Sequence, residues 1–174
     1  QVLDDSTITE PVFRDADIVG FDMKCLSWQA IADPLKGQPN GIDSRTICGL
    51  TLYAGISDRI SFMGIYEIPS TPMTHQLLAQ MIWYFIEGVH YRFGEYPVYT
   101  QDFSKYSVTL SDQIMVFYKS ESSQRWWMEL TNNSHLNNKS KSTTLLACTE
   151  KDYRDATNDN IPDRWYNAVK RFDF

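Results

Sequence analysis

The pattern of apolar and polar residues at the start of the chain predicts a strand, a loop and a helix. Residues 17–23 are nearly all apolar, which is typical of a central strand in a sheet. The next segment, QAIADPLKGQPNGIDS, contains two prolines and two glycines and predicts a long loop. Ser44 is an N-cap candidate because its hydroxyl can accept a hydrogen bond from an early helix N–H. The helix would then continue through RTICGLTLYA, with Ile47, Leu50 and Ala54 on one face, and end at Gly55.

A second strand, RISFMGIYEIP, follows this helix and ends near Glu67. A strand, a helix and a strand of these lengths form a βαβ unit, so the two strands should run parallel. The carboxyl ends of both strands would then lie at the same edge of the sheet. The sequence therefore predicts that Asp22 and Glu67 emerge close together, where α/β proteins place their ligands.

The clearest helix in the sequence begins after Thr71, which is a suitable cap, with Pro72 in its first turn and Gly88 just past its end. Its apolar residues recur at helical spacing and predict a face that packs in the core: Leu77, Leu78, Met81, Ile82, Phe85 and Ile86. Trp83 and Tyr84 extend the apolar surface beyond that face. They indicate a second packing partner.

The sequence changes character at residue 96 and divides the chain into residues 1–95 and 96–174. The segments YSVTL, QIMVFYKS, QRWWMEL and TTLLACT are short and β-rich, which predicts an antiparallel meander or hairpins. Trp126 and Trp127 should point to opposite faces of a strand, one into the core and the other at an interface or over the surface. LTNNSHLNNKSKST should be an exposed, mobile loop. EKDYRDATND and IPDRWYNAVKRF predict closing helices.

Length, composition and charge indicate a folded globular protein and argue against a nucleic-acid binder and a membrane-spanning protein. The 174 residues, 43% hydrophobic, are enough for one globular domain with a sizeable core. A net charge of −6 argues against a nucleic-acid binder, and no apolar run approaches the ~20 residues that span a membrane. The start shows no signal peptide and no initiator Met, so we expect a cytoplasmic protein that lacks an N-terminal portion. The scattered cysteines, Cys25, Cys48 and Cys148, predict reduced, buried thiols.

Familiar catalytic motifs are absent, including the phosphate loop, G-x-G-x-x-G, H-E-x-x-H and G-x-S-x-G. The chain has three histidines, His75, His90 and His135, and their spacing is not that of a pair of metal ligands. We expect each of them to be an ordinary surface residue. The remaining candidate chemistry is the pair of carboxylates, Asp22 and Glu67.

Three segments around these carboxylates resemble a known family. DIVGFDMKCLSW, PNGIDSRTICGLTLYAGIS and ISFMGIYEIPS follow, in order, the last part of the arginase, agmatinase and formimidoylglutamase family, the ureohydrolases. AQMIWYFIEG, RWWMEL and IPDRWYNAVKRF are similar to a divergent bacterial branch of it. The resemblance covers most of the chain from residue 17. It implies the C-terminal part of a three-layer α/β fold, with a mostly parallel sheet, helices on both faces and a β-rich extension.

The family hydrolyses guanidino or formimino C–N bonds with two Mn²⁺ ions that share a hydroxide. By the resemblance, Asp22 falls on the first aspartate of the family's S-F-D-x-D strand and is a metal ligand. The second aspartate falls on Lys24, whose ammonium would repel the metal ions. Glu67 falls on the glutamate that contacts the cationic group of the substrate, without the Asn that follows it in the family. Gly64 stands where the family often has Asp.

Two upstream ligand motifs of the family are not in this chain. We therefore expect one Mn²⁺ or none, and a partner that is either the N-terminal part of the same protein or a companion chain. A homo-oligomer is also possible. Lys24 has three interpretations: it pairs with Asp22, it pairs with Glu67, or it turns toward solvent. Two functions stay open, a metal-dependent hydrolase of small amidines and a non-catalytic pseudoenzyme that serves binding or assembly.

Overall fold

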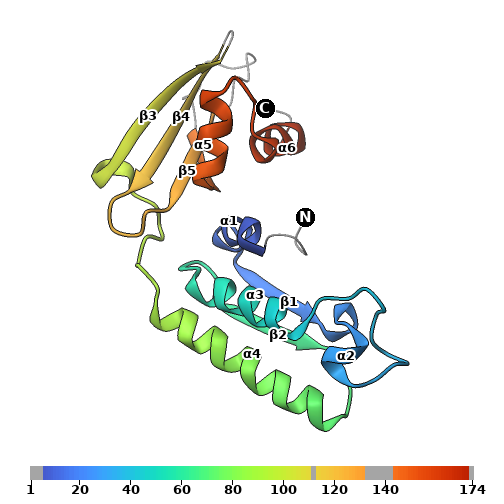
Figure 1. Ribbon diagram of the computed structural model, residues 1–174. Coiled ribbons are helices and arrows are strands. Elements are labelled where there is room, and N and C mark those ends of the chain that lie inside the picture. Colours follow the sequence, from blue (N-terminus) through green and yellow to red (C-terminus); the bar gives the residue numbers. More distant parts are fainter. Residues whose placement is uncertain (1–5, 111–112, 132–142, 173–174) are drawn as a thin grey trace. The chain divides into compact units, whose positions relative to one another are not determined.

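The computed structural model describes residues 6–110, 113–131 and 143–172 of the chain. It divides into two compact units, Gln1–Tyr96 and Pro97–Phe174, and each unit is described by itself. The fold is mixed α/β. The first unit contains a two-stranded parallel sheet and the second a four-stranded antiparallel sheet (Figure 1).

The first unit contains the predicted βαβ arrangement. Its elements are η1 Ser6–Thr9, α1 Glu10–Arg14, β1 Ile18–Asp22, η2 Met23–Cys25, α2 Trp28–Ile31, α3 Ser44–Ile56, β2 Phe62–Tyr66 and α4 Pro72–His90. The strands β1 and β2 are parallel, with Ile18 opposite Phe62 and Asp22 opposite Tyr66. The parallel pairing expected from the strand–helix–strand pattern is therefore confirmed.

The sheet of the first unit is covered on one face. Val19 and Phe21 of β1, with Met63 and Ile65 of β2, pack into the core that includes α3 and α4. Successive residues of a strand point to opposite faces, so Ile18, Phe62 and Tyr66 lie on the other face, where all three are exposed. Within the described residues of the first unit, no helix or strand covers this second face of the sheet.

Two glycines lie opposite each other in the middle of the open face. Gly20 pairs with Gly64 across the strands. A Cβ atom at Gly64 would lie 2.3 Å from the Tyr66 hydroxyl oxygen, and one at Gly20 would lie 3.2 Å from a carbon of the Tyr66 ring. The Tyr66 ring therefore lies over both glycines, which is the close approach that a glycine inside a strand often marks.

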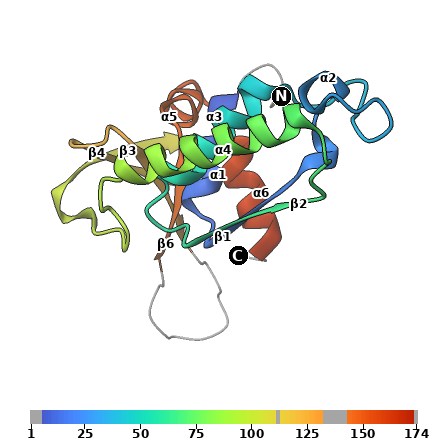
Figure 2. The ribbon, with the colours of Figure 1, turned by 90° about the horizontal axis from the view of Figure 1, so that it is seen from below.

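The helices α3 and α4 lie side by side (Figures 1 and 2), and their closest approach is made by glycines. A Cβ atom at Gly55 would lie 2.2 Å from the carbonyl oxygen of Phe85, and one at Gly88 would lie 2.5 Å from that of Leu52. The expectation that Gly88 follows the end of its helix is wrong. The helix continues to His90, and Gly88 lies inside it because α3 leaves no room there for a side chain.

The caps of these helices differ in one case from the prediction. Asp43, not Ser44, is the N-cap of α3, because its carboxylate accepts a hydrogen bond from the Thr46 N–H at 2.7 Å. The helix also ends at Ile56, one residue beyond the expected glycine. Thr71 caps α4 as predicted by accepting from the Thr74 N–H at 3.1 Å.

The core-facing side of α4 is narrower than its sequence predicts. Leu77 and Met81 are buried and Phe85 packs against the same core, but Ile82 and Ile86 are exposed. The apolar stripe is wider than the part that α3 and the sheet cover, so the expectation that both isoleucines are core residues is wrong. The prediction for α3 is confirmed, because its Ile47, Leu50 and Ala54 are all buried.

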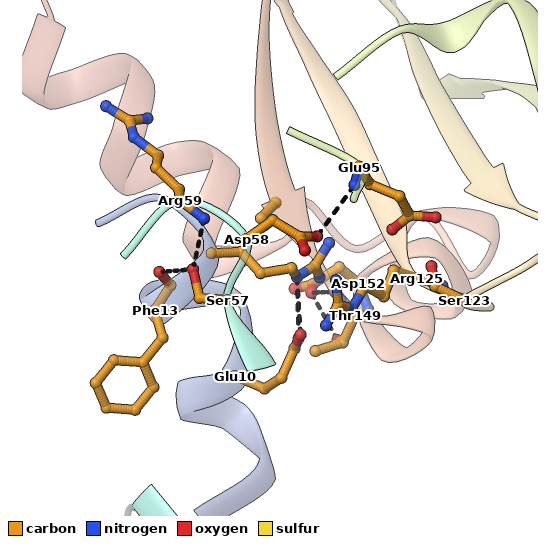
Figure 3. Close-up of polar contacts among 12 residues, drawn as sticks. Glu10, Phe13, Ser57, Asp58, Arg59, Glu95, Ser123, Arg125, Thr149 and Asp152 are labelled. Atoms are coloured by element: carbon orange, nitrogen blue, oxygen red, sulfur yellow. Dashed lines mark hydrogen bonds and ion pairs between the residues drawn. The ribbon is translucent and has the colours of Figure 1, made fainter. Parts of the chain in front are cut away.

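Polar contacts close the turn between α3 and β2 (Figure 3). The Ser57 hydroxyl donates to the Phe13 carbonyl oxygen at 2.9 Å and accepts from the Arg59 N–H at 3.4 Å. The Asp58 carboxylate accepts from the N–H of Glu95 at 3.2 Å. These bonds connect α1, the turn and the segment after α4, which holds the entry into β2 in place.

The second unit is the predicted meander followed by helices. Its elements are η3 Thr100–Asp102, β3 Phe103–Leu110, β4 Gln113–Ser120, β5 Trp126–Thr131, β6 Thr143–Cys148, α5 Glu150–Thr157 and α6 Asp163–Phe172. The strands pair antiparallel in the order β3-β4-β5-β6. The mobile loop expected at LTNNSHLNNKSKST falls mainly on residues 132–142, which lie outside the described residues.

Aromatic side chains fill the core between this sheet and α5. The Tyr153 ring stacks on Trp126 with 4.8 Å between ring centroids, and its centroid lies 5.3 Å from that of Tyr106. Trp127 is also buried, on the opposite face of β5, where it stacks on Phe103 at 5.0 Å. Both tryptophans are therefore buried, whereas the sequence placed one of them at an interface or over the surface.

We expect the stability of the second unit to depend on pH through Tyr118 in β4. Its hydroxyl donates to the Glu129 carboxylate at 2.5 Å. Burial first, then this bond and the carboxylate charge, raise the pKa of Tyr118 to about 12. An ordinary tyrosine has a pKa of about 10, so between these values the folded protein keeps a proton that the unfolded chain releases. The stabilisation from Tyr118 is thus complete below pH ~10 and is lost as the pH rises through ~12.

Tyrosinate absorbance measured during an alkaline titration tests this expectation. The wild type minus Tyr118→Phe difference should show a residue that ionises near pH 12, and Glu129→Gln should lower that midpoint. A midpoint near 10 in the folded wild type would contradict the assignment.

Candidate ligand site at the carboxyl edge of the parallel sheet

The carboxyl ends of β1 and β2 bring the candidate residues together. Asp22 is the last residue of β1 and lies opposite Tyr66, the last residue of β2. Glu67 follows directly and adopts a φ of 54°, in the left-handed region. A residue other than glycine costs about 1–3 kcal/mol in such a conformation, and strain of this kind concentrates at functional sites. The backbone at Glu67 therefore marks this edge of the sheet as a candidate site.

Asp22 has a structural partner. Its Oδ1 atom accepts a hydrogen bond from the backbone N–H of Lys24 at 2.9 Å, which makes Asp22 the N-cap of η2. The cap turns the chain at the end of β1 and positions Lys24 over the edge of the sheet. One carboxylate oxygen of Asp22 is therefore already used in holding the local backbone.

Lys24 spans the gap between the two strand ends. Its ammonium nitrogen lies 2.9 Å from Oε2 of Glu67. The two side chains are 55% and 56% exposed, so solvent screens the pair and its contribution to stability is small. The bond to Glu67, that carboxylate's charge and, less strongly, Asp22 raise the pKa of Lys24. Of the three interpretations, the side chain of Lys24 pairs with Glu67 and remains cationic at neutral pH.

The residues around this edge do not fit a dinuclear manganese site. Divalent cations of this kind require several oxygen ligands and negative charge. Here an ammonium group lies on Glu67, and Asp22 shares its carboxylate with a backbone N–H. Among the residues that the structure describes, no group of three or more His, Cys, Asp or Glu side chains is arranged to hold a metal ion.

Cys25 corrects one expectation. It is exposed, whereas Cys48 and Cys148 are buried as predicted. Partial burial of its thiol and the charge of Asp22 raise the pKa of Cys25, so this thiol is a poor nucleophile at neutral pH. His75 and His90 are exposed surface residues of α4, and His135 lies outside the described residues.

Comparison with family models, with curated proteins and with solved structures finds no match to this chain. In the described part of the chain, no helix is both long enough and apolar enough to cross a membrane.

Tyr66 is the part of the site that the sequence did not indicate. It lies opposite Asp22 and covers Gly20 and Gly64. The sequence feature that could have indicated it is the glycine in the middle of each strand, because such a glycine often marks a group that approaches the backbone closely. The left-handed backbone of Glu67 had no signal in the sequence, because glycine or asparagine is the usual residue there.

Proposed function

We propose that this chain is a segment of a cytoplasmic ureohydrolase-like protein whose dinuclear manganese site is degenerate. The observation that supports the proposal best is the ion pair of 2.9 Å between Lys24 and Glu67, beside Asp22, at the carboxyl edge of a parallel sheet. The two carboxylates stand where the resemblance requires a metal ligand and a substrate contact. Lys24 stands where a second metal ligand is required and supplies positive charge instead.

The proposal includes a three-layer fold completed by another segment. Purely parallel sheets are normally covered by helices on both faces, but within the described residues of the first unit one face of the sheet formed by β1 and β2 is uncovered. Its exposed Ile18, Phe62 and Tyr66 support a companion segment that packs there, either the N-terminal part of the same protein or another chain.

A non-catalytic pseudoenzyme is the second candidate. The ion pair at this edge of the sheet favours the pseudoenzyme. Lys24 neutralises Glu67, the residue that would contact the cationic group of an amidine substrate. In this case the edge of the sheet binds a ligand, or the chain serves assembly, without hydrolysis. In the hydrolase, other segments supply the missing ligands and Asp22 still contributes to a metal site.

Metal analysis of the purified protein tests the proposal. After incubation with excess Mn²⁺ and desalting, we expect one bound ion per chain or none by plasma mass spectrometry. The Lys24→Asp variant should bind Mn²⁺ more tightly than the wild type, because it removes the repulsive ammonium and adds a carboxylate. Lys36→Asp, which changes another exposed lysine in the same way, is the matched control.

Two ions per chain in the wild type, lost on Asp22→Ala, would contradict the degenerate site and establish an intact one. Equal Mn²⁺ affinities for the wild type, Lys24→Asp and Lys36→Asp would show that Lys24 is not what weakens metal binding. A metal-free wild type without amidine hydrolysis would favour the pseudoenzyme over the hydrolase.

A further inference from the structure

Four backbone hydrogen bonds hold the loop between α2 and α3 against residues 25–28, which directly follow Lys24. Gln38 and Ile42 of the loop each donate one of these bonds and accept another. Their partners are the carbonyl oxygens of Leu26 and Cys25, at 2.8 and 3.0 Å, and the N–H groups of Trp28 and Ser27, at 3.2 and 2.9 Å. We call these four bonds the loop clamp. It fixes the backbone that leads away from the candidate ligand site.

The fold requires a glycine between the two ends of the loop clamp. A Cβ atom at Gly41 would lie 2.4 Å from the backbone carbonyl carbon of Leu26 and 2.5 Å from the backbone nitrogen of Ser27. These are backbone atoms that the loop clamp holds in place, so they cannot move aside as the end of a side chain can. Close packing of two backbone segments therefore fixes Gly41, as is usual where one backbone approaches another.

The residue before this glycine is an exposed asparagine. The side-chain amide of Asn40 has no hydrogen-bond partner among the residues that the structure describes. The Gly41 N–H donates to the Gln38 carbonyl oxygen at 3.3 Å, which is longer than a usual N–H···O bond, so this nitrogen is weakly held. An unbonded, solvated amide therefore lies next to a backbone nitrogen that no side chain of its own residue shields.

An asparagine in this position loses its amide group through a reaction with its own backbone. The Gly41 nitrogen attacks Cγ of Asn40, the new N–C bond closes a five-membered succinimide ring, and the side-chain nitrogen leaves as ammonia with the proton of the Gly41 amide. Water then opens the ring. Its attack at Cγ gives aspartate, whereas its attack at the backbone carbonyl carbon of Asn40 gives isoaspartate, in which the main chain passes through the former side chain.

We propose that Asn40 is a site of spontaneous deamidation and that its isoaspartate form opens the loop clamp. Isoaspartate adds one atom to the main chain between Gln38 and Ile42, both of which the loop clamp holds. The contact of Gly41 with the backbone of residues 26 and 27 leaves no space for the added length on that side. The loop therefore loses hydrogen bonds on one side of Asn40, and the backbone that follows Lys24 loses its support.

Mass spectrometry of trypsin digests tests the site after the whole chain has been incubated at physiological temperature and mildly alkaline pH. The peptide GQPNGIDSR, residues 37–45, should convert into two acidic products, and faster at higher pH because the attacking nitrogen must lose its proton. The matched control in the same digest is WYNAVK, in which the exposed Asn167 precedes alanine and should keep its amide. A sample digested before incubation corrects for conversion during digestion. An Asn40 that keeps its amide in the folded chain, while the free peptide GQPNGIDSR converts, would overturn the site.

Hydrogen exchange measured by NMR tests the effect on the loop clamp. In the isoaspartate form, purified from the incubated sample, the amide protons of Ser27, Trp28 and Ile42 should exchange at least about tenfold faster than in the unmodified chain, as the loss of one or two hydrogen bonds implies. The Asn40→Asp variant is the matched control, because it carries the same charge without the added main-chain atom, and it should exchange like the wild type. Equal exchange in the isoaspartate form and in Asn40→Asp would overturn the opening of the loop clamp.

Discussion

Replacing Gly88 by alanine should destabilise the first unit by about 3 kcal/mol, at the upper end of the usual cost of overpacking. The added Cβ atom would lie 2.5 Å from the carbonyl oxygen of Leu52 and 2.8 Å from the backbone nitrogen of Ile56. Both are backbone atoms of α3, which cannot rotate away as the end of a side chain can. The helices must therefore separate, and the core beneath them, which includes Leu50 and Met81, loses contacts.

Urea unfolding followed by circular dichroism, with hydrogen exchange of α3 and α4, measures the loss. Gly49→Ala is the matched control, because a Cβ atom at Gly49 in α3 meets nothing within 4 Å. That variant should gain about 0.5–1 kcal/mol, since alanine restricts the unfolded chain and favours the helix. Equal effects of Gly88→Ala and Gly49→Ala would show that the helices do not pack as closely as described.

The same glycine shows why local sequence patterns predict some features and miss others. Caps and periodicity placed α4 correctly at its start, because Thr71 acts on the backbone of its own first turn. Gly88 resembles a helix stop in sequence, but its role is set by α3, more than 30 positions earlier. Asp43 and Ser44 are both good caps, and the local pattern could not decide between them. Features within one element were predictable, whereas features set by a distant neighbour were not.

At the candidate site, too, the sequence predicted the features set within single elements better than those that depend on neighbouring ones. The apolar run that ends at Asp22 and the βαβ spacing predicted which strand ends meet, and the register confirms it. The direction of the Lys24 side chain was left open, because it depends on η2, a turn that Asp22 caps through the Lys24 backbone. The sequence showed which groups are present at this edge. The short turn that Asp22 caps places the Lys24 ammonium 2.9 Å from Glu67, while the side chain stays 55% exposed to solvent.

In α4, the helical periodicity identified the apolar positions but not which of them are buried. Leu77 and Met81 face the core, while Ile82 and Ile86 belong to the same stripe in sequence and are exposed. A single helix with apolar residues on more than one side has two possible partners, and α3 is one of them. The second packing partner that Trp83 and Tyr84 indicated in the sequence stays a prediction.

Replacing Trp126 by alanine should cost about 3–5 kcal/mol in the second unit, the usual range for removing a buried tryptophan. Trp126 is buried and stacks on Tyr153 of α5, so its loss opens a cavity between the sheet and the helix. Urea unfolding and hydrogen exchange of residues 103–131 and of α5 measure the effect. Tyr99→Ala, at an exposed aromatic residue before β3, is the control and should change stability by less than about 0.5 kcal/mol. A Trp126→Ala variant as stable as the control would show that the aromatic cluster does not hold α5 on the sheet.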